Sequence, residues 1–279
     1  MTVEDDEPGG RGQLPRSLIV TVYGLYAREV GGWLSVASII KLLARCGVDA
    51  PAVRSAVSRL KKRGLLVAAK QAGVAGYGLS DEAHRILREG DQRIFERRRA
   101  VEGDGWLLAV FSVPEAERDR RHRLRSRLSW LGFGMVASGV WIAPAHLLDH
   151  TRDSLEHSGL AAYVNLFHAD HLGFTDIADQ VQNWWDLPRL HRLYDEFLDR
   201  HGPVLDGYRD RTEIDPATAF CDLVGALTDW RRLPYADPGL PTEVLPADWN
   251  GLRAADTFFE LNDRLAEPAH DYAAGILRP

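Results

Sequence analysis

The chain has 279 residues, which is enough for two or three domains, and its hydrophobic share of 45% and charged share of 27% are typical of a globular protein. No run approaches the roughly 18 apolar residues of a membrane-spanning helix, so we expect no membrane partner. Two cysteines, Cys46 and Cys221, are widely separated and not in a metal-binding spacing. This excludes a disulfide-rich scaffold or a cysteine-rich zinc site and favours a reducing cytoplasm. Residues 1–14 are acidic and polar, unlike a signal peptide, and are expected to form a disordered tail.

The net charge of −6 hides a division of charge along the chain. Residues 16–70 contain ten lysines and arginines but two acids, whereas residues 101–279 contain 17 basic and 29 acidic residues. A basic head joined to an acidic body is typical of a nucleic-acid-binding module attached to a regulatory part. Contact with nucleic acid should therefore be confined to the head.

Three helices followed by a hairpin are expected in the basic head. Ser35 and Asp49 are good N-caps for the second and third helices, and Gly64 ends the third. The expected helices cover residues 14–28, 36–45 and 50–63; strands cover 65–70 and 77–79 around a turn at 71–76; a basic helix capped by Ser80 covers 81–99. This order is that of a winged helix-turn-helix.

The third expected helix has two chemically different faces. Its apolar side chains recur at the helical period and should pack inward; they are Val53, Ala56, Val57 and Leu60. The opposite face has no carboxylate and offers hydroxyl, guanidinium and ammonium groups, which suit base edges and phosphates in a major groove. Its residues are Arg54, Ser55, Ser58, Arg59 and Lys62.

Arg59 is the expected base reader, because a bidentate guanidinium–guanine pair is the commonest specific contact. Lys61, Arg63 and Lys70, the last near the tip of the hairpin, are expected to contact phosphates. The alternatives are a solvated basic helix face and a winged helix used only for protein contact.

Residues 104–170 are expected to form a second domain. An apolar run at 106–113, closed by Pro114, predicts a buried strand, and a highly charged helix follows over 115–131. Short strands at 133–137 and 140–143, a helix over 144–157 and a strand over 162–168 complete the order βαββαβ. This order is typical of a ferredoxin-like domain, which we interpret as a dimerisation element.

Helical patterns alone fill residues 171–279, with helices expected at 175–186, 187–201, 217–233 and 252–274. The segment 234–249 has four prolines within 13 residues, so no helix is expected there. The predicted fold class is therefore α+β with three domains: a winged helix-turn-helix at 15–100, a ferredoxin-like domain at 104–170 and an all-helical effector domain at 171–279.

Three blocks of this sequence together carry a resemblance to a known protein family. The first block is Pro-Arg-Ser-Leu-Ile at 15–19 with Tyr-Gly at 23–24. The second is Val-Arg-Ser-Ala-Val-Ser-Arg-Leu at 53–60, followed by Gly-Leu-Leu at 64–66 and Tyr-Gly-Leu-Ser at 77–80. The third is Trp-Arg-Arg-Leu-Pro at 230–234, Asp-Pro-Gly-Leu-Pro at 237–241 and Leu-Pro-Ala-Asp-Trp at 245–249, and its length and unusual composition argue against a chance match. With these blocks the chain resembles the PaaX-type transcriptional repressors, and the resemblance extends from Arg16 to about Leu277.

The resemblance implies a winged helix-turn-helix, a middle domain similar to ferredoxin-like nuclease subunits of CRISPR systems, and a helical C-terminal domain. It also implies a homodimer that represses a catabolic operon and leaves its DNA when a metabolite binds, an aryl-acetyl-CoA thioester in the best-known members. The expected partners are thus a double-stranded DNA operator with an inverted repeat and a small-molecule effector, with a CoA thioester as the leading candidate. No cofactor is expected.

Two catalytic alternatives are weaker. A metal-dependent nuclease of the ferredoxin-like type needs a carboxylate at the end of the first strand, where this chain has Phe-Ser-Val-Pro at 111–114. A thioesterase-like C-terminal domain needs a nucleophile, and no serine elbow, glycine-rich phosphate loop or catalytic Cys/His pairing is evident. We expect neither enzymatic activity nor a bound metal.

Two histidines are candidates for an effector or metal site. His168 and His171 flank Asp170 where the last strand of the middle domain gives way to a helix. The alternative is a polar loop whose side chains cap neighbouring backbone groups.

Two tryptophans and two arginines are further effector candidates. Trp184 and Trp230 could offer aromatic walls, and Arg231 and Arg232 could bind an anionic ligand. The alternative is that the tryptophans are core residues and that the arginines anchor the Pro-rich segment through one of its two aspartates, at positions 237 and 248.

Overall fold

The computed structural model describes residues 14–96 and 98–277, so the tail predicted over residues 1–14 lies outside the described part except for its last residue. The described residues form two compact units. Among the described residues, the sheet unit contains 95–194 and 232–251, and the winged unit contains 14–94, 195–231 and 252–277. The predicted C-terminal domain is thus divided between the two units, and the three-part division by sequence remains a prediction.

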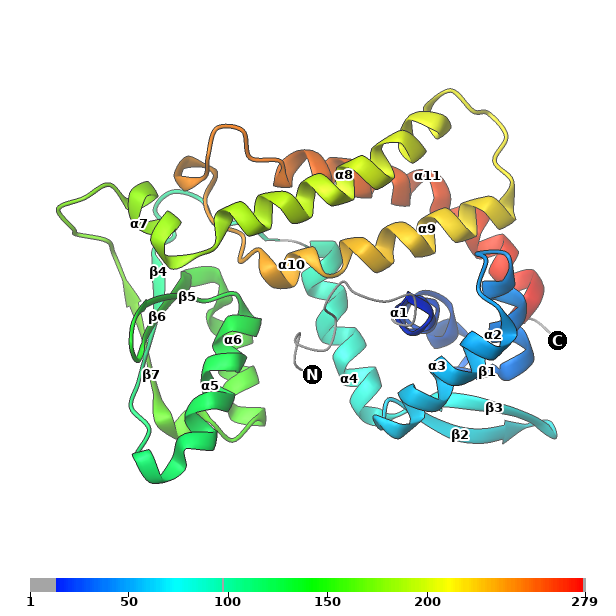
Figure 1. The fold of residues 1–279 in the computed structure, drawn as a ribbon, viewed down its shortest axis with the longest axis horizontal. Helices are drawn as coiled ribbons and strands as arrows, with labels where there is room; N and C mark the ends of the chain where they lie inside the picture. Colours follow the sequence, from blue (N-terminus) through cyan, green and yellow to red (C-terminus); the bar gives the residue numbers. More distant parts are fainter. Residues whose placement is uncertain (1–13, 97, 278–279) are drawn as a thin grey trace. The chain divides into compact units, whose positions relative to one another are not determined.

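The winged unit begins with the predicted series of three helices and a hairpin (Figure 1). The first helix continues beyond α1 through a π-helical turn and a 3-10 turn, and Gly31, with a φ of 83°, ends it. Ser35 and Asp49 cap α2 and α3 as predicted, and their side chains accept hydrogen bonds from the backbone of Ser38 and Ala52. The elements are α1 Leu14–Val22, β1 Trp33–Ser35, α2 Val36–Ala44, α3 Ala50–Lys62, β2 Leu66–Gln71, β3 Val74–Leu79 and α4 Asp81–Asp91.

The hairpin is longer than the sequence predicts. The three strands pair antiparallel in the order β1-β3-β2, and the pairing of β2 with β3 reaches Gln71 and Val74. The turn is therefore Ala72-Gly73, and the predicted six-residue turn at 71–76 is wrong. Ala72 and Gly73 have φ values of 48° and 82°, which suits the tight hairpin turn that matches the twist of the strands.

The helix-turn-helix and the C-terminal helices of the winged unit share one hydrophobic core. Buried side chains of α1, such as Ile19, lie in one cluster with Phe220 of α9 and Leu261 of α11. Thr21 and Thr228 also join α1 to α9 through a buried hydroxyl hydrogen bond of 2.7 Å. The long helices are α8 Leu187–Arg209, α9 Pro216–Trp230 and α11 Gly251–Leu277.

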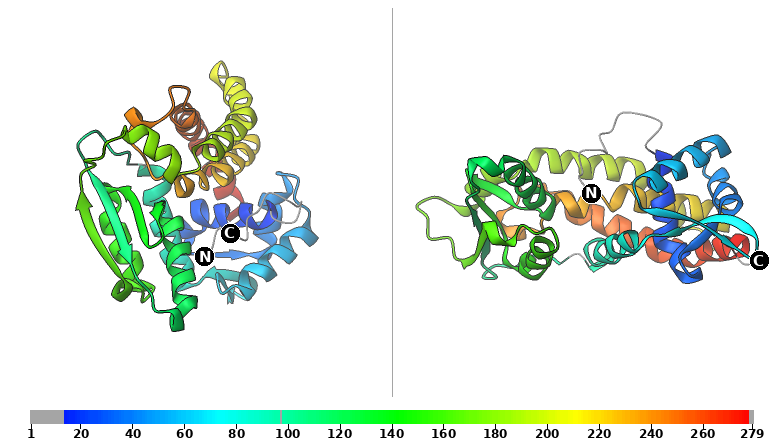
Figure 2. Two further views of the ribbon diagram at one scale, coloured as in Figure 1. Left: turned by 60° about the vertical axis from the view of Figure 1, so that its left-hand side comes forward. Right: turned by 90° about the horizontal axis from the view of Figure 1, so that it is seen from below.

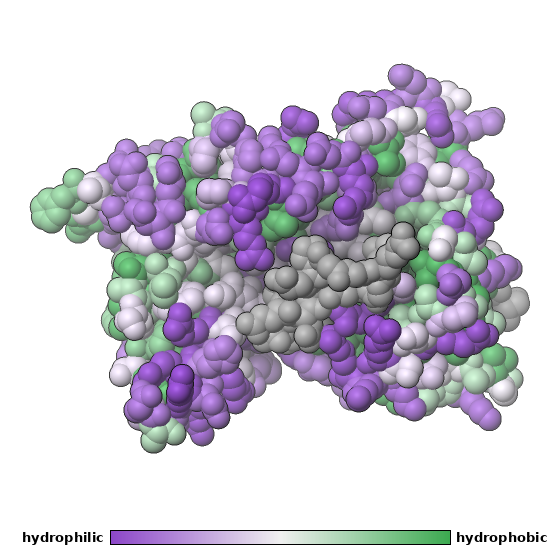
Figure 3. All heavy atoms as spheres, viewed as in Figure 1, coloured by the Kyte–Doolittle hydropathy of each residue, from purple (hydrophilic) through white to green (hydrophobic). Residues whose placement is uncertain are grey.

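Helix α8 extends past its predicted end at His201 and includes Pro203 in its interior. Proline lacks the N–H that would bond to the carbonyl four residues earlier, which usually ends a helix. Here the extra turns are retained because Leu205 and Tyr208 are 2% and 3% exposed and lie in the shared core. The outward surface of α8 is largely hydrophilic (Figure 3).

The sheet unit has the predicted ferredoxin-like topology. Its elements are β4 Trp106–Phe111, α5 Arg118–Leu131, β5 Gly134–Ala137, β6 Val140–Pro144, α6 Leu148–His157, β7 Val164–Ala169 and α7 Ile177–Trp184. The strands pair antiparallel in the order β5-β6-β4-β7, so the first and third strands of the βαββαβ series are central.

Both faces of this sheet are covered, because alternate residues of β4 point to opposite sides. Leu107 and Ala109 belong to one core cluster with the buried leucines of α5, and Figure 2 shows α5 and α6 along the same side of the sheet. Trp106 belongs to a second cluster that includes Val181 of α7 and Leu240 of the Pro-rich segment.

The Pro-rich segment contains two short helical turns, α10 Leu233–Ala236 and a 3-10 turn Thr242–Val244. The prediction that no helix occurs there is wrong, because Pro234 lies in the first turn of α10, where a missing N–H costs little. The path of the segment is restricted at Gly239, which is buried. It has a φ of 72°, and an added Cβ would lie 2.6 Å from the Arg98 carbonyl oxygen.

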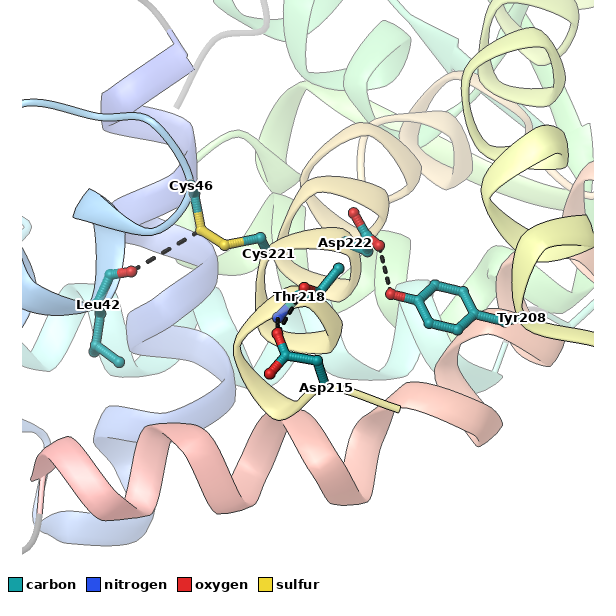
Figure 4. The surroundings of a disulfide bond; sticks show 7 residues. All are labelled: Leu42, Cys46, Tyr208, Asp215, Thr218, Cys221 and Asp222. Carbon is teal, nitrogen blue, oxygen red and sulfur yellow. Dashed lines mark hydrogen bonds between the residues drawn. A yellow bond between two sulfur atoms is a disulfide. The ribbon is translucent and has the colours of Figure 1, made fainter. Parts of the chain in front are cut away.

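Cys46 and Cys221 are joined by a disulfide, although 175 residues separate them (Figure 4). The sequence spacing gives no indication of this pairing, which arises because α9 packs against the helix-turn-helix. No helix in the described part of the chain is long and apolar enough to cross a bilayer.

Candidate nucleic-acid interface

Helix α3 divides into the two predicted faces. Its four predicted inward side chains are 0–4% exposed and lie in the shared core. The helix packs on α1 and α2 and is followed by β2. The apolar face therefore fixes the position of the helix, and the side chains of the opposite face are not needed for that packing.

All eight residues predicted to contact DNA are exposed: Arg54, Ser55, Ser58, Arg59, Lys61, Lys62, Arg63 and Lys70. Seven lie on or directly after α3, and Lys70 lies on β2 opposite Ala75, one residue pair before the turn. The structure thus brings the helix residues together on one surface and places Lys70 near the tip of the hairpin.

Arg59 has a defined partner on the outward face. Its Nη2 donates a hydrogen bond of 3.1 Å to Ser55 Oγ, one helical turn earlier. This contact uses one of the five guanidinium donors, so a bidentate edge remains for a guanine or a phosphate. Ser55 therefore orients Arg59 in the free protein, which is a role the sequence did not reveal.

The hairpin is held by hydrogen bonds from two side chains outside it, Tyr23 and Trp33. Tyr23, which is 1% exposed, donates its hydroxyl to the Tyr77 carbonyl at 2.8 Å, and Trp33 Nε1 donates to the Ala69 carbonyl at 3.3 Å. Gly76 lies against Trp33, and a Cβ there would collide with the indole ring and the Leu34 carbonyl. A glycine inside a strand often marks the close approach of another group, so Gly76 was the sequence feature that could have predicted this contact.

Exposed guanidinium, ammonium and hydroxyl groups on a rigid helix beside a two-stranded hairpin can bind a polyanion. The helix can enter a major groove, which admits one α-helix, while the hairpin contacts the adjacent backbone. Asp49 is the acid closest in sequence, and its carboxylate is engaged at the N-terminus of α3, 2.7 Å from the Ala52 nitrogen.

The end of β4 is the place where a metal-dependent nuclease would need a carboxylate. Strand β4 ends at Phe111, and the nearest acid along the chain, Glu115, pairs with Arg121 at 2.9 Å. Among the described residues, no group of three or more His, Cys, Asp or Glu side chains is arranged to hold a metal ion.

The structure brings His171, one of the two candidate histidines, close to Trp184. The rings of His171 and Trp184 are 6.4 Å apart, edge to face, beside the Trp106–Trp185 pair. His168 instead contacts the Asp104 carbonyl through Nε2, at 3.1 Å. His168 thus lies on strand β7 and contacts the backbone, while His171 and Trp184 lie close enough to act together. The effector role of both histidines stays a prediction.

Trp230 lies in the core of the winged unit. It is 0% exposed, stacks on Phe258 with centroids 4.9 Å apart, and donates Nε1 to the Ile94 carbonyl at 3.3 Å. This placement corrects the effector interpretation of Trp230 in favour of the core alternative, because a side chain without exposed surface cannot contact a ligand in this conformation. Arg231 is half-buried and Arg232 is exposed.

The Pro-rich segment is anchored by a buried carboxylate, Asp237, and the partner that the sequence missed is Arg99. Arg99 donates to Asp237 at 3.2 Å and to the Leu240 carbonyl at 2.6 Å, and Tyr194 donates to the same carboxylate at 2.7 Å. Because 138 residues separate Arg99 from Asp237, no local sequence pattern could predict this ion pair.

Three family descriptions match successive parts of the chain. "PaaX-like protein" matches residues 14–83, "PaaX protein central Cas2-like domain" matches residues 100–181, and "PaaX-like protein C-terminal domain" matches residues 185–275. The three matches follow one another in the order that the sequence resemblance implies.

Two individual proteins are similar over most of the chain. The transcriptional repressor PaaX of Escherichia coli K12 is 27% identical over 257 residues, which cover 91% of this chain and 81% of the repressor. The solved structure of the uncharacterized protein Rv0674 from Mycobacterium tuberculosis has a TM-score of 0.59 and 25% identity, and the match covers 93% of this chain and 98% of that one.

Proposed function

The chain belongs to the PaaX-like family, and from this premise we propose that it is a cytoplasmic, dimeric transcriptional repressor that a small-molecule effector releases from its operator. The observation that carries the proposal is the division of α3. Its apolar face is buried in the core, and its other face exposes arginine, lysine and serine side chains with no acid among them. The relative in Escherichia coli is a transcriptional repressor, which supports a regulatory rather than an enzymatic role.

Arg59→Ala is expected to weaken specific operator binding by about 1–3 kcal/mol, because it removes the proposed bidentate contact to a base. Binding to random duplex should change much less. A gel-shift titration on operator and random DNA measures both affinities. Arg125→Ala, an exposed arginine of α5 in the sheet unit, is the matched control and should bind operator normally.

Unchanged discrimination between operator and random DNA in Arg59→Ala would remove Arg59 from the base-reading role. Equal losses on both DNAs would reassign Arg59 to phosphate contact. Lys70→Ala provides that comparison, because a phosphate contact from the hairpin should weaken both DNAs alike.

The sheet unit supplies the proposed dimer contact. Strand β7 pairs with β4 and forms one edge of the sheet, so no further strand of the described chain pairs with its outer side. Phe167 on this strand is 52% exposed, and Leu172 and Phe174 in the loop that follows are among the most exposed apolar side chains. Figure 3 shows this loop as an apolar projection. A second copy of the chain would cover these side chains.

A dimer should protect an inverted repeat with half-sites about 10 base pairs apart, or a multiple of that spacing, because each recognition helix enters one major groove. DNase footprinting of the operator, with sedimentation of the free protein, measures both symmetry and oligomeric state. A monomer that protects a single unsymmetrical site would contradict the dimer proposal.

We place the effector within the sheet unit, near His171 and Trp184, with His168 and Arg232 of the same unit as further proposed contacts. The aromatic and basic groups suit an anionic ligand, and a CoA thioester is the leading class. A thermal-shift screen of acyl-CoAs and aromatic acids tests this site. Ligand at 100 times its Kd should stabilise the protein by about 2.7 kcal/mol, and a His171→Ala/Trp184→Ala variant should lose that response.

A further inference from the structure

The disulfide lies directly before the recognition helix. Cys46 is in the turn between α2 and α3, and Cys221 is in α9 of the same winged unit (Figure 4). Their Cα atoms are 5.2 Å apart, within the range of roughly 4.4–6.8 Å that disulfides require. The backbone therefore holds the two residues where oxidation can join them without moving either helix.

Neither cysteine of the pair is fully buried. The Cys46 and Cys221 side chains are half-buried and pack at the margin of the shared core. Partly exposed thiols react, whereas fully buried ones are inert. Cys46 Sγ also lies 4.0 Å from the Leu42 carbonyl, so a reduced Cys46 thiol would keep an acceptor there. The same packing thus accommodates the linked and the unlinked pair.

The residues that follow Cys46 fix the start of α3. Gly47 has a φ of 76°, Val48 is 8% exposed, and Asp49 caps the helix through the Ala52 nitrogen. A covalent link at Cys46 restrains this turn against α9, and with it the first turn of the helix that carries Arg54 and Ser55. Cys46 is therefore placed to affect the mobility of the DNA-contacting surface.

We propose that Cys46 and Cys221 form a reversible redox link that sets the mobility of the recognition helix. As a consequence that rests on the proposed repressor function, the link sets how tightly the protein holds its operator. In a reducing compartment such disulfides are transient and redox-sensing rather than structural. The oxidised form holds α3 in the geometry seen here, with its polar face exposed, so oxidation preorganises the DNA-binding surface.

The oxidant is a small disulfide, such as oxidised glutathione. One protein thiolate attacks it to give a mixed disulfide and one molecule of small thiol. The second protein thiolate then attacks the protein sulfur of the mixed disulfide, forms the Cys46–Cys221 bond and expels the second small thiol. The pair loses two electrons and two protons, and the small disulfide is reduced to two thiols. A small dithiol reverses the sequence.

The experiment compares full-length protein treated with oxidised glutathione or with dithiothreitol. Peptide mass spectrometry should find the Cys46–Cys221 link in the first sample only. Hydrogen exchange over residues 44–56 should be slower in the oxidised sample. Operator affinity should be tighter by roughly three- to tenfold, the range expected when one or two groups need no longer be ordered on binding. A small disulfide does not oxidise methionine, so the chain's two methionines are left unchanged.

The control is the Cys46→Ser/Cys221→Ser double variant, which removes every thiol of the chain. It should bind operator like the reduced wild type and should not respond to oxidant. Absence of the link in oxidised, folded protein would overturn the proposal, as would equal exchange in the linked and reduced forms. A redox response retained by the double variant would also overturn it. A protein that bound no DNA in either state would instead refute the repressor function. The mass spectrometry and hydrogen-exchange measurements would still show whether the link forms and whether it restrains residues 44–56.

Discussion

Trp230→Ala is expected to destabilise the winged unit by about 3–5 kcal/mol, the cost of truncating a fully buried tryptophan. Trp230 has no exposed surface and stacks on Phe258, with ring planes 11° apart. Phe197 and Phe259 complete its surroundings, with ring centroids at 5.5 and 6.1 Å. Removal of the indole leaves a cavity among three rings that cannot close without moving α8 or α11. It also leaves the Ile94 carbonyl without this donor.

Urea unfolding followed by circular dichroism measures the loss. Trp230→Phe separates packing from hydrogen bonding, because it keeps an aromatic ring and loses the N–H group; about half of the alanine effect is expected. Leu252→Ala is the matched control on α11, since Leu252 is 46% exposed, and should change the free energy of unfolding by less than about 0.5 kcal/mol.

The Trp230 variants also discriminate between the two roles that the sequence left open. A core residue gives a large loss of stability whether or not an effector is present. A loss below about 1 kcal/mol in Trp230→Ala, well under the range for a buried tryptophan, together with an altered effector response, would contradict the core placement and restore the ligand-binding interpretation.

The features predicted correctly from the sequence are those with local causes. The inward face of α3 follows from apolar residues at a period of 3.6, and the starts of α2, α3 and α4 follow from capping side chains at Ser35, Asp49 and Ser80. The ferredoxin-like order follows from alternating patterns of strand and helix. Each single helix or strand in these predictions is signalled within fewer than about 20 residues, the range in which periodicity and capping operate.

The errors and omissions have causes that the local sequence does not contain. Helix α8 continues through Pro203 because Leu205 and Tyr208 are buried by other helices. The Cys46–Cys221 link joins residues 175 positions apart and depends on how α9 packs on α1. In both cases tertiary packing overrides or adds to the local preference.

The exposed face of α3 could be predicted for a related reason. A surface that binds a charged partner has no packing requirement of its own, so its residue types report directly on that partner. An effector site requires side chains from several elements to converge, and convergence is a property of the tertiary fold. This explains why the proposed DNA contacts of α3 form one surface, whereas of the six proposed effector residues Trp230 lies in the core and His168 bonds to backbone.

Asp237→Ala should cost about 3–5 kcal/mol, because it removes one partner of a buried ion pair and leaves the other without its counter-charge. The Asp237 side chain is 1% exposed and that of Arg99 is 16% exposed. The carboxylate accepts from Arg99, from the Tyr194 hydroxyl and from the Gly239 nitrogen, the last at 2.8 Å. Its loss would release the Pro-rich segment from the residues that precede β4 and from α8.

Two measurements test this prediction. Urea unfolding should show the loss of stability, and limited proteolysis should show new cleavage within residues 234–249, since the segment would lose its anchor before the unit unfolds. Asp237→Asn keeps the shape and one acceptor oxygen but loses the charge, so a smaller loss of about 1–3 kcal/mol is expected. Asp248→Ala, an exposed acid of the same segment, should leave both readouts unchanged. Equal sensitivity at Asp237 and Asp248 would show that composition of the segment, rather than the buried carboxylate, holds it in place.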